Sequence, residues 1–158
     1  MKAATVHELK DELQQLSPKQ LVELCLRLSK FKKENKELLT YLLFEAHDLP
    51  AYIHNVKEQM DEAFTALNKT QVFLAKKTIR KALRIANKHI RFTGSKIAEV
   101  ELLIHFCTLL KDCGINLSRT PVMLNLYQGQ LKKVQAALKG LHEEEAYDYK
   151  RIVDKLKM

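Results

Sequence analysis

A row of basic side chains between Lys76 and Arg91 is the feature of this sequence best suited to chemistry. Five of them follow one another at steps of 3, 4, 4 and 3 residues, which places them on one face of a helix: Lys77, Arg80, Arg84, Lys88 and Arg91. Lys76 and Lys81 widen this face. From Lys76 to Arg91 a helix extends about 22 Å at 1.5 Å per residue. The pattern therefore indicates a site for a polyanion.

The segment around this row contains no acidic residue. Between Glu62 and Glu99 lie nine of the 27 basic residues, and the other 18 are spread over a chain with 19 acidic ones. The formal net charge of +8 therefore belongs entirely to this segment. Because a localised positive field steers a protein toward anions, we expect residues 69–96 to dock on one.

Nucleic acid and an acidic protein surface are the two candidate partners, and the sequence favours nucleic acid. The row is long enough to follow several phosphates, which lie about 3.4 Å apart along each strand. Phe73 and Phe92 are too few for a base-stacking platform, so contacts would go mainly to the backbone. The alternative is a face that is merely solvated, or neutralised by Asp61, Glu62 or residues 143–145 of another helix.

Catalytic patterns are mostly missing. The glycines lie at positions 94, 114, 129 and 140, so no glycine-rich phosphate loop is present. Glu101 and His105 lie one helical turn apart and could share a proton or a metal ion, although a histidine on a buried helix more often serves packing. His105 and Cys107 could bind zinc only together with further ligands, and the sequence offers none at a suitable spacing. We expect no enzymatic activity, metal or cofactor, and the Glu101–His105 pair stays open as a third hypothesis.

The elements that must position these residues are helical nearly throughout. Apolar residues recur with helical spacing, and capping residues, prolines and glycines mark the ends. Helices are expected at about residues 6–15, from 18, at 38–46, from 50, at 69–92, at 97–110, from 121 and from 142. We predict an all-α protein of seven to eight antiparallel helices. They would form a single domain, residues 1–158, as a bundle or a short stack of helical hairpins, with residues 1–4 disordered.

Residues 18–46 could form one helix or two. Positions 21, 24, 28, 31, 35, 38 and 42 keep an unbroken 3–4 pattern with Asn35 at one seam position, as in a single long helix. The polar run at 32–36 has the length that joins antiparallel helices, and Asn35 tolerates the left-handed conformation that ends a helix. We predict a break in this run.

Three segments are strongly apolar. Residues 38–46 and 97–110 have almost no polar face, which predicts helices buried on several sides. From Leu124 to Leu141, apolar residues at steps of 3, 4, 3, 4 and 3 form a seam that is typical of a core or a dimer interface.

The longest stretch without a charged residue, from Thr120 to Leu131, is too short to span a membrane. The first sixteen residues contain no apolar signal core, and the three cysteines include no CxxC pair. We therefore expect a cytoplasmic protein without a membrane span.

The sequence thus favours a non-catalytic α-helical interaction module whose basic helix docks on a polyanion. The alternative is a protein–protein scaffold or a homo-oligomer with the basic face merely solvated. Its interface would be the seam at 124–141 or the apolar helix at 38–46.

Overall fold

The computed structural model describes all residues, Met1–Met158, and contains eight α-helices and no strand. The predicted all-α class is therefore confirmed. None of the helices has both the length and the apolar character that crossing a bilayer requires. By its internal contacts the chain divides into two compact units, Met1–Glu45 (unit 1) and Ala46–Met158 (unit 2). Folding of residues 1–158 as one domain, and disorder of residues 1–4, stay predictions.

Unit 1 consists of three short helices and a π-helical turn: α1 (Val6–Gln14), α2 (Pro18–Phe31), α3 (Lys33–Thr40) and η1 (Tyr41–Glu45). The first two helices begin at capping boxes, which Thr5 forms with Glu8 and Ser17 forms with Gln20. Each box satisfies backbone N–H groups that lack a partner in the first turn of a helix. Local sequence therefore determines where these helices start.

A single residue, Lys32, separates α2 from α3. It has an extended backbone, with φ −140° and ψ 144°. Nδ2 of Asn35 donates a hydrogen bond of 2.9 Å to the carbonyl oxygen of Leu28, one of the carbonyls left over in the last turn of α2. The predicted break is confirmed, but the left-handed conformation expected at Asn35 is not, because only glycines have positive φ.

Unit 1 buries almost none of its apolar side chains. Helices α1, α2 and α3 contain no buried residue. The prediction that residues 38–46 are buried on several sides is wrong, since only Tyr41 is buried there, whereas Leu42, Leu43 and Phe44 are 55%, 64% and 68% exposed. The physical reason is size, because a unit of this length has too little chain to surround a helix that is apolar on all sides.

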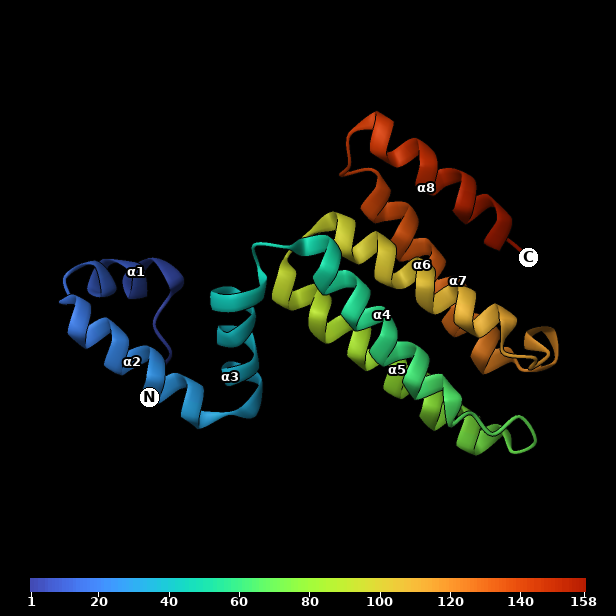
Figure 1. Ribbon diagram of the computed structural model, residues 1–158, viewed down its shortest axis with the longest axis horizontal. Coiled ribbons are helices and arrows are strands. Elements are labelled where there is room, and N and C mark those ends of the chain that lie inside the picture. Colours follow the sequence, from blue (N-terminus) through green and yellow to red (C-terminus); the bar gives the residue numbers. More distant parts are fainter. The chain divides into compact units, whose positions relative to one another are not determined.

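Unit 2 consists of five helices and a 3₁₀ turn: α4 (Leu49–Thr65), α5 (Val72–Thr93), α6 (Lys96–Asp112), η2 (Leu117–Arg119), α7 (Pro121–Leu138) and α8 (Glu143–Leu156). Successive helices run antiparallel (Figure 1). Helix α6 contacts each of the other four and is buried along most of its length, as its missing polar face predicts. Unit 2 is therefore a bundle of consecutive hairpins around α6.

The predicted seam on α7 lies in the core of unit 2. Tyr127, Leu131, Val134 and Leu138 are at most 7% exposed. The hydroxyl of Tyr127 donates a hydrogen bond of 2.5 Å to the carbonyl oxygen of Leu156, which joins α7 to the end of α8. The seam thus packs within the chain and is not left free to form a dimer interface.

Candidate polyanion-binding face

Helix α5 carries the basic row, and it begins later than predicted. Residue 69 was expected to lie at its start, but Oδ1 of Asn68 accepts the N–H groups of Thr70 and Gln71, at 3.0 and 2.9 Å. These bonds form a turn in the α4–α5 loop, so the helix begins at Val72 and Lys69 lies outside it. The end agrees with the prediction, since Gly94 terminates α5 with φ 59°.

The buried side of α5 determines where the basic row points. Buried residues follow one another at steps of 4, 3, 4 and 3 along one stripe: Ala75, Ile79, Ala82, Ala86 and His89. This stripe packs in unit 2, where α5 contacts α4 and α6. At 100° per residue the row at positions 77, 80, 84, 88 and 91 is centred on the opposite side of the helix. The row therefore faces away from the core.

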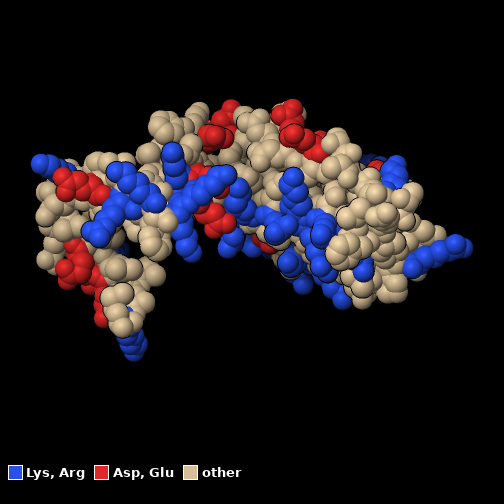
Figure 2. Space-filling model, turned by 90° about the horizontal axis from the view of Figure 1, so that it is seen from below, with Lys and Arg blue, Asp and Glu red and all other residues tan.

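All seven predicted polyanion-binding residues lie on α5, and most of them are exposed. Five are exposed, namely Lys77, Arg80, Lys81, Arg84 and Arg91, whereas Lys76 and Lys88 are half-buried. In the space-filling view, Lys and Arg side chains gather over α5 with few Asp or Glu atoms among them (Figure 2). The spacing argument therefore placed these cations together correctly.

Six of these seven cations lack acidic partners within the chain. No carboxylate oxygen lies within 4.0 Å of a side-chain nitrogen at six of the seven positions: Lys76, Lys77, Arg80, Lys81, Arg84 and Arg91. Asp61, one of the acids that could have neutralised the row, contacts His105 instead. Glu62 and residues 143–145 make no ion pair with α5. The positive charge at these six positions is thus left uncompensated.

A groove of about 770 Å³ runs between α5 and the end of α4. Four basic residues line its α5 side: Lys77, Arg80, Lys81 and Arg84. Ala63 and Ala66 form the α4 side, and none of the lining residues is acidic. Because the alanines are small, the groove stays open beside the guanidinium and ammonium groups. Its shape and charge suit a chain of anionic groups.

Two aromatic rings lie next to the row. Nζ of Lys77 is 4.8 Å from the centre of the Phe73 ring, and Nζ of Lys88 is 5.9 Å from the centre of the Phe92 ring. Such cation–π contacts hold an ammonium group over a ring face without neutralising its charge. Phe73 is 68% exposed one turn before Lys77, so it extends the face by one turn.

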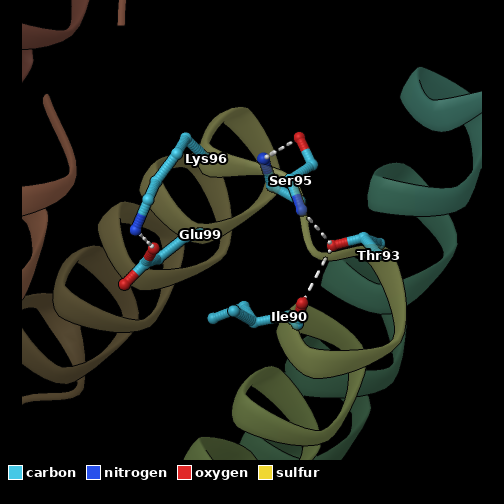
Figure 3. A network of polar contacts seen from close by, with 6 residues as sticks. Ile90, Thr93, Ser95, Lys96 and Glu99 are labelled. Carbon is cyan, nitrogen blue, oxygen red and sulfur yellow. Dashed lines mark hydrogen bonds and ion pairs between the residues drawn. The ribbon is translucent and has the colours of Figure 1, made fainter. Parts of the chain in front are cut away.

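A hydrogen-bonded corner joins α5 to α6 (Figure 3). Oγ1 of Thr93 donates to the carbonyl oxygen of Ile90 at 3.0 Å and accepts the N–H of Ser95 at 3.2 Å. Oγ of Ser95 in turn accepts the N–H of Ala98 at 3.3 Å and caps α6. These bonds fix the direction in which the chain leaves the basic helix.

The basic face ends at this corner. Lys96, the last cation of the acid-free segment, pairs with Glu99 at 2.9 Å, as the close-up shows (Figure 3). Lys69, the first, lies in the loop before α5. Of the nine cations in the predicted segment 69–96, the structure thus places seven on α5, one in the loop before it and one, paired with Glu99, on α6.

A buried polar pair beneath the face was not predicted. The hydroxyl oxygen of Tyr52 on α4 lies 2.5 Å from Nδ1 of His89 on α5. Their ring centres are 5.5 Å apart with the planes inclined at 66°. His89 falls on the buried stripe of α5, three residues after Ala86. The same spacing rule that found the basic row could therefore have placed this histidine in the core.

Glu101 and His105 do not contact each other. Glu101 accepts hydrogen bonds from Nζ of Lys57 at 2.6 Å and from the hydroxyl of Tyr149 at 2.9 Å. Nε2 of His105 lies 2.6 Å from Oδ1 of Asp61. Each member of the proposed pair thus has its own partner on α4 or α8.

No group of three or more His, Cys, Asp or Glu side chains is arranged to hold a metal ion. Cys107, considered with His105 as a zinc ligand, is fully buried. Burial raises the pKa of its thiol to about 12. Because the thiolate is the form that binds a metal, this environment disfavours Cys107 as a ligand.

Fold and site together define an all-α protein with a strongly basic helix on its surface. Comparisons of the chain with protein-family models, with curated proteins and with solved structures found no significant match. A helical bundle by itself does not indicate function, which has to rest on the chemistry of the α5 face.

Proposed function

We propose that this protein is a non-catalytic interaction module whose α5 face binds the phosphate backbone of a nucleic acid. The observation that carries the proposal is a set of five exposed cations on α5 with no carboxylate in ion-pair distance, namely Lys77, Arg80, Lys81, Arg84 and Arg91. Like charges one turn apart on a helix repel by a few tenths of a kcal/mol per pair. Phosphates docked along the row would remove this repulsion.

Length and groove shape favour a nucleic-acid backbone over an acidic protein surface. The row extends about 22 Å and stays on one side of the helix, as a regular chain of phosphates requires. The groove beside it offers Lys77, Arg80, Lys81 and Arg84 to one strand. Since phosphate contacts carry no sequence information, binding would depend weakly on sequence.

Fluorescence polarisation with single- and double-stranded oligonucleotides across a salt series tests this proposal. Binding that releases counterions from about five phosphates makes log K fall with log[salt] at a slope of about −4 on duplex DNA. Preparations need first to be checked for bound nucleic acid, which absorbance shows readily in a protein without tryptophan.

A pair of charge-reversal variants makes the test specific for the face. Arg80→Glu, Lys81→Glu and Arg84→Glu together reverse three exposed groove residues, and half-buried Lys88 is left unchanged. The matched control reverses three exposed lysines on or next to α7: Lys132→Glu, Lys133→Glu and Lys139→Glu. Both triple variants change the net charge equally. We expect the α5 variant to lose at least about tenfold in affinity together with most of the salt slope, while the control keeps both.

Three results would count against the proposal. Equal losses in both triple variants would mean that net charge alone attracts the oligonucleotide. Failure of the native protein to bind at low salt would favour the alternative, a protein–protein scaffold or homo-oligomer with a solvated basic face. Binding to polyglutamate in preference to oligonucleotides would indicate an acidic protein partner.

A further inference from the structure

Unit 1 exposes the apolar side chains that a folded unit normally buries. Eleven large apolar residues between Val6 and Phe44 are between 36% and 85% exposed. On α2 they cover more than half of the circumference, with Leu24, Leu28 and Phe31 on one side and Val22 on another. Helices α1, α2 and α3 bury nothing. Such a surface indicates a binding partner.

An apolar groove of about 310 Å³ lies between α2 and α3. Four leucines line it, Leu28, Leu38, Leu39 and Leu42, and Cys25 lies at its side. The hydrogen bond from Asn35 to Leu28 holds the two helices at the bend that forms the groove. The groove is therefore suited to receive an apolar side chain from outside.

We propose that unit 1 is a self-association surface and that unit 1 of a second copy of this chain occupies it. The proposal does not rest on the proposed function, because none of its residues lies on α5. Two observations, the apolar area and the distribution of charge, favour a second copy as the occupant.

The exposed apolar area is sufficient for a dimer. At roughly 60–120 Å² for each fully exposed large side chain, the eleven residues offer on the order of 400–800 Å² on each copy. A standard interface takes about 800 Å² from each partner, a little over half of it apolar. Covering most of these side chains therefore meets the requirement of a stable dimer.

The charges of unit 1 are separated in a way that complements a second copy. Residues 1–45 contain eight basic and seven acidic residues, so the unit as a whole has little attraction for a polyanion. Glu8, Asp11 and Glu12 make α1 acidic, whereas residues 27–33 contain four basic residues and no acidic one. A two-fold interface is self-complementary, so it can place the acidic α1 of each copy beside the basic segment of the other, which joins the end of α2 to the start of α3.

The mass of the full-length protein in solution tests the proposal. Light scattering or sedimentation equilibrium over a concentration series should show a species of twice the 18.3 kDa chain. Leu28→Glu, in the groove, should weaken dimerisation about tenfold or more. Leu43→Glu on η1 provides a second test should Leu28→Glu lose helix content. Val122→Glu on α7, which alters a side chain of similar exposure in unit 2, should leave the mass unchanged.

The thiol of Cys25 reports whether the dimer uses this groove. Cys25 is exposed, whereas Cys107 and Cys113 are buried, so a thiol reagent reacts with Cys25 alone in the folded protein. We expect its reaction rate to fall severalfold as the protein concentration rises, and to stay high in Leu28→Glu. A native protein that is monomeric at all concentrations would overturn the proposal. So would a dimer in which Cys25 stays reactive or which Leu28→Glu leaves intact.

Discussion

The ammonium group of Lys57 on α4 lies 2.6 Å from a carboxylate oxygen of Glu101 on α6. One turn further along both helices, Asp61 and His105 form a second contact of 2.6 Å, in which the acidic group lies on α4. A slide of α4 by one turn in one direction would set the carboxylate of Asp61 against that of Glu101. The polarity of the two contacts thus disfavours this shifted register, as charge patterns do between paired helices.

Replacing Glu101 with alanine tests this role. The change leaves Nζ of Lys57 and the hydroxyl of Tyr149 without their acceptor in a part-buried position. We expect the free energy of unfolding, measured by urea denaturation, to fall by about 1–3 kcal/mol. Glu62→Ala on the exposed side of α4 is the control and should stay within about 0.5 kcal/mol of the native protein. Equal stability of the two variants would contradict the role of Glu101.

Tyr149 makes the stability of the fold sensitive to alkali. Burial, and then the hydrogen bond that its hydroxyl donates to Glu101, raise the pKa of Tyr149 from 10.0 to about 12. The folded state thus holds this proton more tightly than the unfolded state. Its contribution to stability is complete below pH 10 and is lost as the pH rises from 10 to 12.

Tyr149→Phe should therefore flatten this alkaline loss. Between pH 10 and 12 the free energy of unfolding of the variant should fall less steeply than that of the native protein. In a titration of phenolate absorbance, the step near pH 12 should be smaller in the variant by the contribution of one tyrosine, while the step of Tyr127 remains. Tyr127 and Cys107, whose pKa values burial also raises to about 12, stay in both proteins and do not affect the difference. Loss of one tyrosine's absorbance from the step near pH 10 instead would contradict the prediction.

The helices could be predicted from the sequence because their ends are determined locally. Thr5, Ser17 and Gly94 act through bonds or backbone conformations within a few residues of themselves. The start of α5 was misplaced because Asn68 can serve either as a helix cap or as a turn residue, and both bond to N–H groups just ahead. Such competition between two local structures is not visible in the spacing of apolar residues.

The composition of the basic face could be predicted, but its uncompensated charge could not. Positions 77, 80, 84, 88 and 91 share a face because of helix geometry alone. Whether acidic residues of another helix pair with these cations depends on how unit 2 packs. In the structure, Asp61 contacts His105 instead. The burial of residues 38–46 was mispredicted for a related reason, because burial depends on the chain available around a helix and not on its own pattern.

Two glycines should respond in opposite ways to alanine. Gly94 has φ 59°, a conformation that alanine adopts with strain, so Gly94→Ala should lower the free energy of unfolding by about 1 kcal/mol. Gly129 lies within α7 with open space around its Cβ position, so Gly129→Ala should raise it by about 0.5–1 kcal/mol. Thermal or urea unfolding measures both. A Gly94→Ala protein as stable as Gly129→Ala would contradict the left-handed cap.

Asn35 should control the bend between α2 and α3. Asn35→Leu removes the bond to Leu28 and completes the apolar 3–4 pattern of residues 21–42, which favours one continuous helix. Spin labels at positions 23 and 36, in a protein with Cys25→Ser, should then lie about 20 Å apart along the axis, farther than in the bent native unit. Lys30→Leu is the control and should leave the distance unchanged. An unchanged distance in Asn35→Leu would show that Lys32 bends the chain without help from Asn35.

The position of α6 in the chain has a consequence for folding. Within unit 2 its contacts are with the two helices before it and the two after it, so only short loops have to close before it is covered. Helical proteins with contacts this local fold in microseconds to milliseconds. During synthesis α4 and α5 are available before α6 emerges, and α7 follows within roughly a few seconds at 5–20 residues per second. The most apolar helix of unit 2 is thus exposed on the nascent chain for only a brief period, which limits aggregation on the ribosome.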